Sequence, residues 1–312
     1  MDPVLQDTSR TATHSELAAL VRDALATAYA RPLVIELEAG RVAVLDGKPL
    51  QIARAAAAAA IGDEAAEQIV ALDMASLPWH AVPASGLRLW RQHGCAGSDG
   101  ELVTEVEAGD PPVQVVVADA GWLLLRLADG AQGWIEPHAA VLAGASAPVE
   151  RPDRVAREAF VHEVLQLEGA TYVWGGTTAT GVDCSGLVQR ACWQAGGPWL
   201  PRHSRALLRV GERVSPSDVD RGDVLVLKRD QDTLDAERQA QLRASMEEEQ
   251  RTGRVPAHGP AVHPMHVAVA LSSVEVLHAS RDTMRVVREP LESLRERYRV
   301  LGVRRICTEA SA

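Results

Sequence analysis

The stretch that decides the fold is TYVWGGTTATGVDCSGLVQRACWQAG, residues 171–196. Its first half is rich in Gly and Thr, and its second half places Leu187, Val188 and Ala191 at helical spacing. Cys184 stands at the junction, where the helix is expected to begin. Unpaired backbone N–H groups and the positive end of the helix dipole stabilise a thiolate there, the nucleophilic form of cysteine. The stretch therefore predicts a loop that turns into a helix and carries a reactive cysteine.

Antiparallel strands are predicted after this helix, in GDVLVLK, HVAVAL, VEVLHAS, MRVVRE and YRVLGVRRI. His266 opens the second of these strands, and His278 lies in the third. If these two strands are consecutive and joined at Ser272-Ser273, both side chains can lie near one end of the sheet. A thiolate nucleophile needs a base, and the base needs an orienting group. A histidine is more often a surface or core residue, but two beside a helix-start cysteine favour catalysis.

Several short motifs follow one another in a fixed order. They are Tyr172-x-Trp174-Gly175-Gly176, Asp183-Cys184-Ser185-Gly186-Leu187, Leu200-Pro201-Arg202, Gly222-Asp223-Val224, His266-Val267-Ala268 and His278-Ala279. Their order and spacing resemble the NlpC-type cell-wall cysteine peptidases. The resemblance implies a papain-like α+β fold over residues 153–308 and hydrolysis of amide bonds in murein stem peptides. In that family the bond is commonly the one between γ-D-glutamate and a diamino acid.

Catalytic roles are carried over from this resemblance. It implies that Cys184 is the nucleophile, that His266 is the general base and that His278 orients the base. The hydroxyl of Tyr172 would lie beside the nucleophile and could donate to the developing oxyanion. No cofactor and no metal are expected.

Substrate contacts are implied for four residues of the same motifs, Asp183, Ser185, Trp174 and Arg202. Gly175-Gly176 would let the backbone pass close to the substrate. Arg202 could equally bind a carboxylate or pair within the fold, and the sequence leaves both readings open.

His203 and Trp90 are two further candidates for substrate binding. His203 stands where related enzymes with an SH3-like domain usually have an acidic residue that could pair with the substrate amine. Trp90, Trp122 or Trp134 would have to supply any aromatic wall from the preceding domain, which contains no tyrosine. The requirement for a free N-terminal L-alanine therefore stays open.

Residues 83–145 contain closely spaced strand signals, in LRLW, ELVTEV, PPVQVVV, GWLLLRL and GWIEP. The pair Gly121-Trp122 and Gly133-Trp134 around the Asp129-Gly130 turn resembles a bacterial SH3-like domain. An unrelated β-meander is the alternative. Residues 143–152, AGASAPVERP, are expected to be a linker.

Residues 1–80 are predicted to form a small mixed α/β unit of unknown role. A helix is expected over 14–29, short strands with an Asp46-Gly47 hairpin turn come next, and an alanine-rich helix is expected over 52–72. In the C-terminal domain, the stretch 230–263 is predicted to be a solvated helix or a lid. It contains His258 and His263, but no cysteine or carboxylate pair stands at ligand spacing for a metal.

Composition limits the classes of function. The net charge of −10 and the pI near 5.5 argue against nucleic acid or an anionic membrane surface as partners. No apolar run approaches the roughly 20 residues that cross a bilayer. The four cysteines do not form a disulfide framework, and the N-terminus lacks a secretory signal. We therefore expect a cytoplasmic location, with export by another route not excluded.

A cysteine endopeptidase with murein stem peptides as its substrate is the function that the sequence favours. A murein-binding protein without hydrolytic activity is one alternative, and an amidase or acyltransferase on the same fold is another. The sequence does not set the preferred diamino acid or the oligomeric state.

Overall fold

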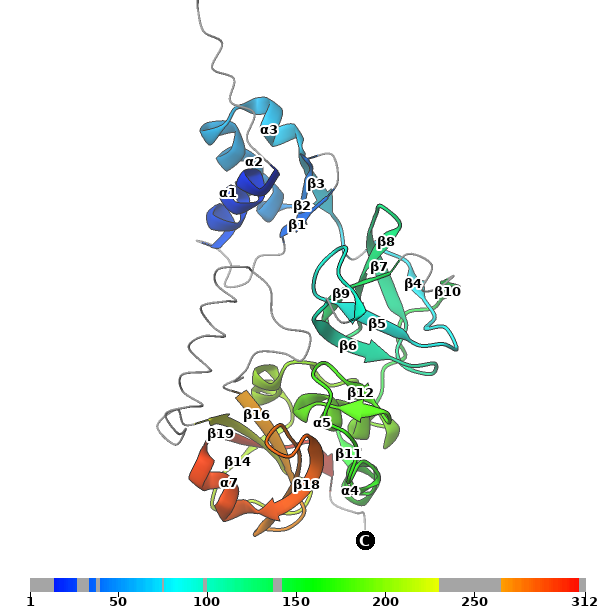
Figure 1. Cartoon of the computed structure of the whole chain (residues 1–312), viewed down its shortest axis with the longest axis vertical. Helices are drawn as coiled ribbons and strands as arrows, with labels where there is room; N and C mark the ends of the chain where they lie inside the picture. The colour runs from blue at the N-terminus through cyan, green and yellow to red at the C-terminus, as the bar shows by residue number, and fades with distance from the viewer. Residues whose placement is uncertain are drawn as a thin grey trace, which may run out of the picture. The chain divides into compact units, whose positions relative to one another are not determined.

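The computed structural model describes residues 14–26, 34–37, 40–74, 76–97, 100–136, 142–229 and 265–308 (Figure 1). The chain divides into two compact units, one of residues 1–78 with 116–121 and the other of 79–115 with 122–312. The domain boundaries proposed from the sequence stay a prediction.

The first unit packs helices against a three-stranded sheet. Its elements are α1 (His14–Ala26), β1 (Val34–Glu36), β2 (Val42–Leu45), α2 (Lys48–Ala60), α3 (Asp63–Glu67) and β3 (Ile69–Leu72). β2 lies in the middle, antiparallel to β1 and parallel to β3. Leu17, Val21 and Leu25 recur at helical spacing and are buried, as the amphipathic pattern of the first helix predicts. The described part of that helix is confirmed, and residues 27–29 lie outside the described residues.

Two local predictions in this unit are wrong. The helix expected over 52–72 ends at Ala60, because Gly62 takes a φ of +114° that a helix cannot contain. Its last four residues form β3 instead, where the β-sheet buries Ile69 completely. Asp46-Gly47 is no hairpin turn, since Gly47 with φ +78° is the N-cap of α2.

A sheet of seven strands, called the β-domain below, follows along the chain. Its strands are β4 (Trp79–His80), β5 (Leu87–Trp90), β6 (Leu102–Val106), β7 (Val113–Asp119), β8 (Trp122–Arg126), β9 (Gln132–Ile135) and β10 (Gly144–Ala145). The order across the sheet is β10-β4-β7-β8-β9-β5-β6. Five of these strands confirm the five strand signals of the sequence. β10 falls in the expected linker, because Gly144 and Ala145 pair with β4.

A helix pair and an antiparallel sheet form the remainder, as the α+β pattern predicts. The elements are β11 (Val155–Ala156), α4 (Arg157–Gln166), β12 (Thr177–Thr178), β13 (Gly181–Val182), α5 (Cys184–Gln194), η3 (Ser204–Arg209), β14 (Glu212–Val214), β15 (Val224–Arg229), β16 (Met265–Ala270), β17 (Glu275–Ser280), β18 (Arg285–Pro290), α7 (Leu291–Arg297), β19 (Tyr298–Arg305) and β20 (Cys307–Thr308). The six-stranded sheet has the order β14-β19-β15-β16-β17-β18.

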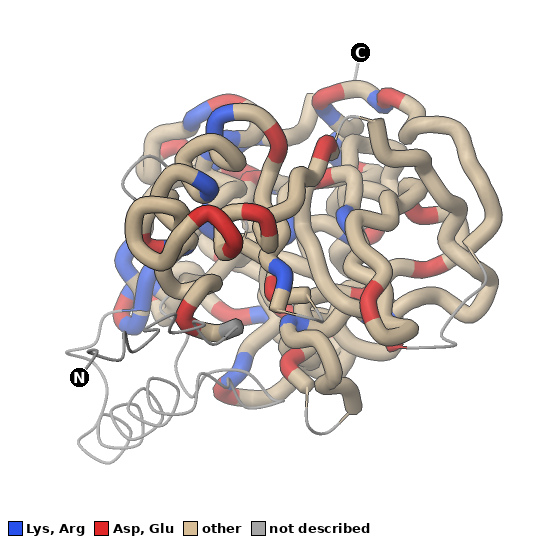
Figure 2. Tube along the Cα trace, turned by 90° about the horizontal axis from the view of Figure 1, so that it is seen from above, with Lys and Arg blue, Asp and Glu red and all other residues tan. Residues whose placement is uncertain are grey.

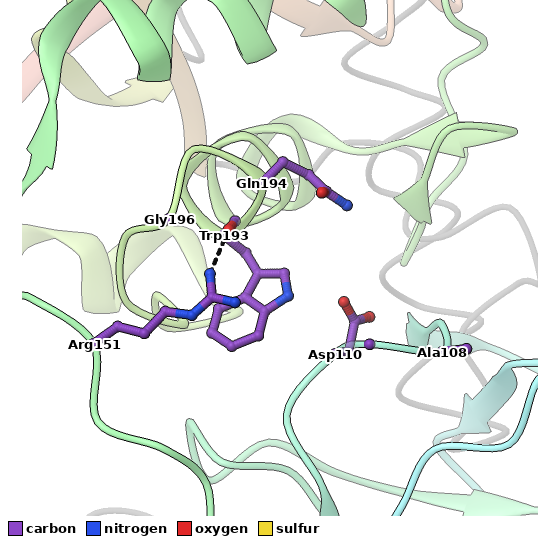
Figure 3. A pocket seen from close by; sticks show the side chains of 7 residues that line it. Ala108, Asp110, Arg151, Trp193, Gln194 and Gly196 are labelled. Atoms are coloured by element: carbon purple, nitrogen blue, oxygen red, sulfur yellow. Dashed lines mark hydrogen bonds between the residues drawn. The ribbon is translucent and has the colours of Figure 1, made fainter.

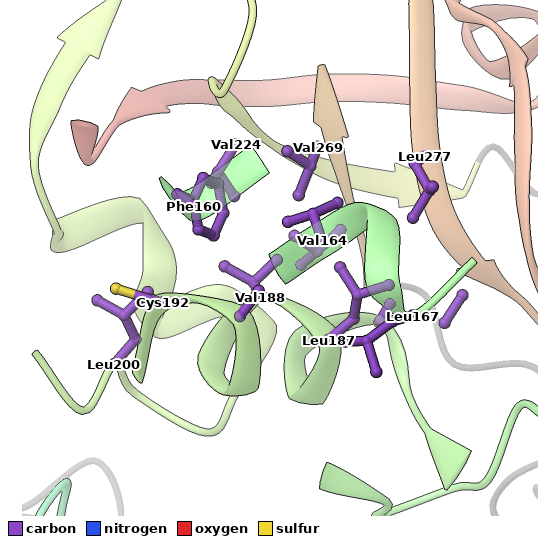
Figure 4. Close-up of a cluster of buried hydrophobic side chains, with 14 of the residues drawn as sticks. Phe160, Val164, Leu167, Leu187, Val188, Cys192, Leu200, Val224, Val269 and Leu277 are labelled. Atoms are coloured by element: carbon purple, nitrogen blue, oxygen red, sulfur yellow. The ribbon is translucent and has the colours of Figure 1, made fainter. Parts of the chain in front are cut away.

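This sheet buries both of its faces, because its central strands are apolar at successive positions. Val269 and Leu277 join a core with Phe160 of α4 and Val188 of α5 (Figure 4). The alternate residues of the same strands pack into a second core with Leu291 and Leu294 of α7. All residues of α5 from 184 to 192 are buried. The helix that starts at the cysteine is therefore held rigidly against the sheet.

Charged residues of both signs are interspersed along the described trace (Figure 2). No helix among the described residues is long and apolar enough to cross a membrane. The stretch 230–263, with its predicted helix or lid and with His258 and His263, lies outside the described residues.

Candidate active site

Asp183 fixes the start of α5 and thereby the position of the cysteine. Its backbone is extended, and its Oδ1 accepts the N–H of Gly186 at 2.7 Å, which makes it a side-chain N-cap. Its Oδ2 accepts the N–H of Gly175 at 3.0 Å. The predicted position of Cys184 at a helix N-terminus is confirmed.

The glycines before the cysteine are required by contacts within the protein. A Cβ on Gly175, whose φ is +77°, would collide with the carbonyl oxygen of Leu102 in β6. A Cβ on Gly176 would meet the backbone of Gly181, and one on Gly186 would collide with the carbonyl oxygen of Gly176. The close approach expected for Gly175 and Gly176 is thus an approach to neighbouring backbone.

The Cys184 thiol is 8% exposed and lies between η3 and β16. Its Sγ is 3.7 Å from the Oγ of Ser204 and accepts a hydrogen bond from the backbone N–H of Val267. Burial, and then the Asp183 carboxylate, raise the pKa of the thiol to about 11 against the opposing effect of these donors. The resting cysteine is therefore a thiol, not the thiolate that the helix N-terminus alone predicts. A base must take its proton.

The two histidines lie on one face of adjacent strands. Ala270 of β16 pairs with Val276 of β17, so the period of two along a strand puts His266 and His278 on the same side. His266 Nε2 lies 2.7 Å from His278 Nδ1, and the two buried rings meet edge to face. The predicted proximity of these side chains is confirmed.

His266 and the thiol are linked through their neighbours. Val267, which donates to the sulfur, is the residue after His266 in β16. Tyr298 stacks on the His266 ring at a centroid distance of 5.0 Å, and burial, followed by the nearby Asp282 and Cys184, raises the pKa of Tyr298. The arrangement brings together a buried thiol and two histidines within hydrogen-bond distance of each other.

Tyr172 is buried, and an arginine lies over its ring. Burial, and then the charges of Cys184 and Asp183, raise the pKa of Tyr172 far above its ordinary value, so its hydroxyl remains a donor. The guanidinium carbon of Arg281 lies 5.9 Å from the centre of the Tyr172 ring and 5.5 Å from that of the Trp174 ring. Trp174 donates its Nε1–H to Glu101 of the β-domain at 3.2 Å.

Arg202 pairs within the fold, which decides between its two readings. Its guanidinium, 4% exposed, donates to both carboxylate oxygens of Asp183 at 2.9 and 2.5 Å. It also donates to Ser185 Oγ at 3.0 Å and to Thr104 Oγ1 of the β-domain at 3.1 Å. Asp183, Ser185 and Arg202 thus contact one another, and substrate contacts by any of them stay a prediction.

His203 and Trp90 lie in different settings. His203 is exposed and is the N-cap residue of η3, directly before Ser204. Trp90 is 6% exposed in β5, where its ring packs so closely on Gly100 that a Cβ there would lie 2.9 Å from it. Little of the Trp90 ring is therefore available to a substrate.

Polar contacts join the β-domain to the helix that carries the cysteine. Arg190 of α5 makes a buried two-point ion pair with Asp110, at 2.6 and 2.8 Å. Thr177 Oγ1 donates to the Glu105 carbonyl oxygen at 2.6 Å. Asp129, in the Asp129-Gly130 turn, accepts the backbone N–H of Arg202 at 2.8 Å.

A pocket of about 280 Å³ lies at the other end of α5 (Figure 3). Asp110, Arg151 and Trp193 line it, together with Ala108, Gly109, Gln194 and Gly196. The Arg151 guanidinium lies flat on Trp193, 3.2 Å from the ring centre. None of the proposed catalytic residues lines this pocket.

Three residues near the site were missed by the sequence analysis, namely Ser204, Arg281 and Glu289. Ser204 stands two residues after the Leu200-Pro201-Arg202 motif, which was an available signal. Glu289 could be found only from the register of β17 and β18, because its pairing with Val276 puts it on the same face as His278. Among the described ranges, no group of three or more His, Cys, Asp or Glu could hold a metal ion.

The sequence around Cys184 is similar to that of known proteins. Residues 169–236 match the model of the NlpC/P60 family. A probable endopeptidase of Mycobacterium tuberculosis is 45% identical over 85 residues, which are 27% of this chain and 22% of that protein. A gamma-DL-glutamyl hydrolase of Bacillus subtilis is 46% identical over 66 residues, 21% of this chain and 16% of that protein. A murein DD-endopeptidase and LD-carboxypeptidase of Escherichia coli is 38% identical over 61 residues, 20% of this chain and 32% of that protein.

The chain spans about a fifth of the length of the first curated relatives that it matches, 22% in each. Among solved structures, an NlpC/P60 family protein from Bacillus cereus is 20% identical, covers 75% of this chain and 65% of that chain, and has a TM-score of 0.37. The matched residues 169–236 contain Tyr172 and Cys184. Residues 169–236 are therefore similar to the NlpC/P60 family.

Proposed function

We propose that this protein is a cysteine endopeptidase that hydrolyses peptidoglycan stem peptides at the bond between γ-D-glutamate and the diamino acid. The relatives named as a gamma-DL-glutamyl hydrolase and a murein DD-endopeptidase support this substrate class. The resemblance of the β-domain to SH3-like domains belongs to the same proposal.

One observation carries the proposal: the buried thiol at the start of α5 and two hydrogen-bonding histidines on β16 and β17. The sulfur of Cys184 accepts the N–H of the residue that follows His266, and His266 Nε2 faces His278 Nδ1 at 2.7 Å. A nucleophile, a base and a group that orients the base are the three parts that acyl transfer needs.

The reaction begins with proton transfer from Cys184 to the Nδ1 of His266. The sulfur attacks the γ-carbonyl carbon, and the resulting tetrahedral intermediate carries its negative charge on oxygen. When it collapses, the C–N bond breaks and the His266 imidazolium gives its proton to the leaving amine. The acyl group is then held as a thioester on Cys184. Water, deprotonated by His266, attacks the thioester and releases the carboxylic acid and the thiol.

Donors for the oxyanion come from the first turn of α5 and from Tyr172. The N–H groups of a helix's first turn have no intrahelical acceptor, so those at Cys184 and Ser185 are suited to bind a developing negative charge. The Tyr172 hydroxyl keeps its proton because its pKa is raised, and it adds a neutral donor.

A cationic side chain stands at the same side of the site. Stem peptides carry free carboxylates, and the guanidinium of Arg281 lies over the rings of Tyr172 and Trp174. Arg281 and Trp174 are partly exposed, whereas Tyr172 is buried. In our proposal Arg281 receives a carboxylate of the peptide while Trp174 packs against its apolar part.

Incubation of the full chain with defined muropeptides, analysed by mass spectrometry, tests the proposed function. The wild type should release L-Ala-γ-D-Glu from L-Ala-γ-D-Glu-diamino-acid peptides and should do so in the presence of EDTA. Cys184→Ser should lose this activity while keeping the circular dichroism spectrum, because a hydroxyl has a much higher pKa than a thiol. Near wild-type turnover by Cys184→Ser, or a loss in EDTA that zinc restores, would refute the cysteine mechanism.

A further inference from the structure

A third strand brings a carboxylate to the far side of the histidine pair. Glu289, near the end of β18, pairs across the sheet with Val276, two residues before His278. Its Oε1 lies 2.8 Å from His278 Nε2. His266, His278 and Glu289 thus follow one another across three neighbouring strands, and each lies within hydrogen-bond distance of the next.

We propose that Glu289 is a positioning residue that fixes the tautomers of both histidines and so leaves the Nδ1 of His266 free of a proton and able to act as the base. The inference rests on the proposed function, because it assigns His266 as the base for Cys184. It adds a fourth member to the set formed by Cys184, His266 and His278.

Proton positions follow from the chemistry of each group in turn. An ionised carboxylate only accepts hydrogen bonds, so His278 must carry its proton on Nε2, facing Glu289. A neutral imidazole has one N–H, which leaves the Nδ1 of His278 as an acceptor. His266 therefore carries its own proton on Nε2, 2.7 Å away, and its Nδ1 bears the lone pair. In the opposite tautomers, His266 would present an N–H to the thiol and could not take its proton.

The protein keeps Glu289 ionised. Burial alone would raise the pKa of this carboxyl, but hydrogen bonding to His278 and the charge of Arg297 hold the pKa below its ordinary value. The Arg297 guanidinium donates to Oε1 at 2.6 Å and to Oε2 at 2.5 Å. Among the described residues, the charged or titratable groups in contact with Glu289 are His278 from β17 and Arg297 from α7.

Further ion pairs hold Arg297 in place, and they extend to the Tyr298 ring that stacks on His266. Arg297 Nη1 donates to Asp282 at 3.0 Å, and Asp282 also accepts from Arg229 at 3.3 Å. Arg229 lies 5.3 Å from the centre of the Tyr298 ring, which stacks on His266. Arg297 therefore keeps a carboxylate partner when Glu289 is replaced, and a Glu289 variant does not leave it as an unpaired cation.

The test compares Glu289→Met, Glu289→Gln and the control Glu292→Gln in the full chain. Glu292 is an exposed glutamate at the start of α7, three residues further on, so its variant removes the same charge without touching a histidine. Glu289→Met removes both the charge and the acceptor, whereas Glu289→Gln keeps an acceptor oxygen. We expect kcat to fall roughly 100-fold in Glu289→Met and about tenfold in Glu289→Gln, with KM changed less than about threefold.

The pH profile separates this role from a structural one. A carboxylate beside the histidine pair favours its imidazolium form electrostatically, and the active base is the neutral form. Without the carboxylate, the acidic limb of kcat/KM should move to lower pH in both Glu289 variants and stay in place in Glu292→Gln. Unchanged kcat and an unchanged acidic limb in Glu289→Met, beside an active wild type, would overturn the inference and leave the proposed function standing.

A second measurement needs neither catalysis nor a folded variant. Long-range ¹H–¹⁵N spectra of the ¹⁵N-histidine-labelled full chain report which ring nitrogen carries the proton. At neutral pH the wild type should show His266 and His278 both protonated on Nε2. Protonation of His278 on Nδ1 alone would overturn the inference, whatever the protein does to muropeptides. Correct tautomers in a protein that cleaves no stem peptide would support the inference and refute the proposed function.

Discussion

Two polar networks lie near Cys184, and they are built differently. The Asp183–Arg202 pair is closed, because the carboxylate accepts from Gly186, Gly175 and Arg202, and the guanidinium is shared with Ser185 and Thr104. The chain from His266 through His278 to Glu289 and Arg297 is linear. One end of the chain is held by ion pairs, and the other end is His266, the proposed base.

The two networks are suited to different tasks, and the linear chain is the one that we propose orders protons. In the closed pair every oxygen already has donors, so the pair fixes the start of α5 and the loop before it. In the linear chain the contacts follow one another from Arg297 through Glu289 and His278 to His266, so we infer that its protons are ordered in one direction, from Glu289 toward His266. We expect damage to the first network to appear in stability and damage to the second in turnover.

Loss of the base should give the largest effect. His266→Asn should lower kcat/KM by about 10⁴-fold or more, because the proposed mechanism then lacks the group that takes the proton of the thiol. His278→Asn should retain more activity, with a loss of about 100-fold, since the asparagine side chain can still accept from His266 Nε2–H. Steady-state kinetics on a stem peptide measure both, with thermal unfolding as the check on folding. Equal and complete losses in the two variants would remove the distinction between base and orienting residue.

Much of this arrangement follows from the sequence, and the reasons are local. The motif around Cys184 combines glycines, an N-cap and helical spacing, and His266 and His278 lie in two short apolar strand segments that follow each other closely in the sequence. These signals act over a few residues, so periodicity reveals them.

The contacts that the sequence does not reveal depend on residues far apart along the chain. The link from His278 to Glu289 depends on the register of two strands, and the choice of Asp183 as the partner of Arg202 depends on tertiary packing. The prediction of an alanine-rich helix over 52–72 was wrong for the same reason, since Ile69–Leu72 pairs with β2 as a parallel strand. The resting state of the thiol is likewise set by burial, which no local pattern reports.

Breaking the closed pair should cost stability. Arg202→Met leaves Asp183 buried without its cation and should lower the free energy of unfolding by about 3–5 kcal/mol in chemical denaturation. Asp183→Asn combined with Arg202→Met should cost less than the sum of the two single variants, because neither charge is then left unpaired.

The exposed pair between Glu168 and Arg288, at 2.7 Å, is the matched control. Glu168→Gln should change stability by no more than about 1 kcal/mol. A similar small change in Arg202→Met would show that the pair does not hold the start of α5, and the contrast between the two networks would fail.

The smallest effect concerns the substrate amine. His203 stands where an acidic residue could hold this amine, and Asp183 is committed to Arg202. Acetylation of the N-terminal L-alanine should therefore lower kcat/KM less than about tenfold, or roughly 1.4 kcal/mol. His203→Asp should increase the preference for the free amine in the same assay. Rejection of the acetylated peptide by a thousandfold would show that another carboxylate binds the amine.

Trapping of the acyl-enzyme is the direct test of the proposal that Cys184 is the nucleophile. The full chain is mixed with a stem peptide, quenched with acid within the first turnover, digested and analysed by mass spectrometry. We predict an L-Ala-γ-D-Glu adduct on the peptide that contains Cys184, more of it in His278→Asn if hydrolysis of the thioester becomes limiting, and none in Cys184→Ala. Release of the diamino acid by Cys184→Ala, or turnover with the adduct on another residue, would contradict the account.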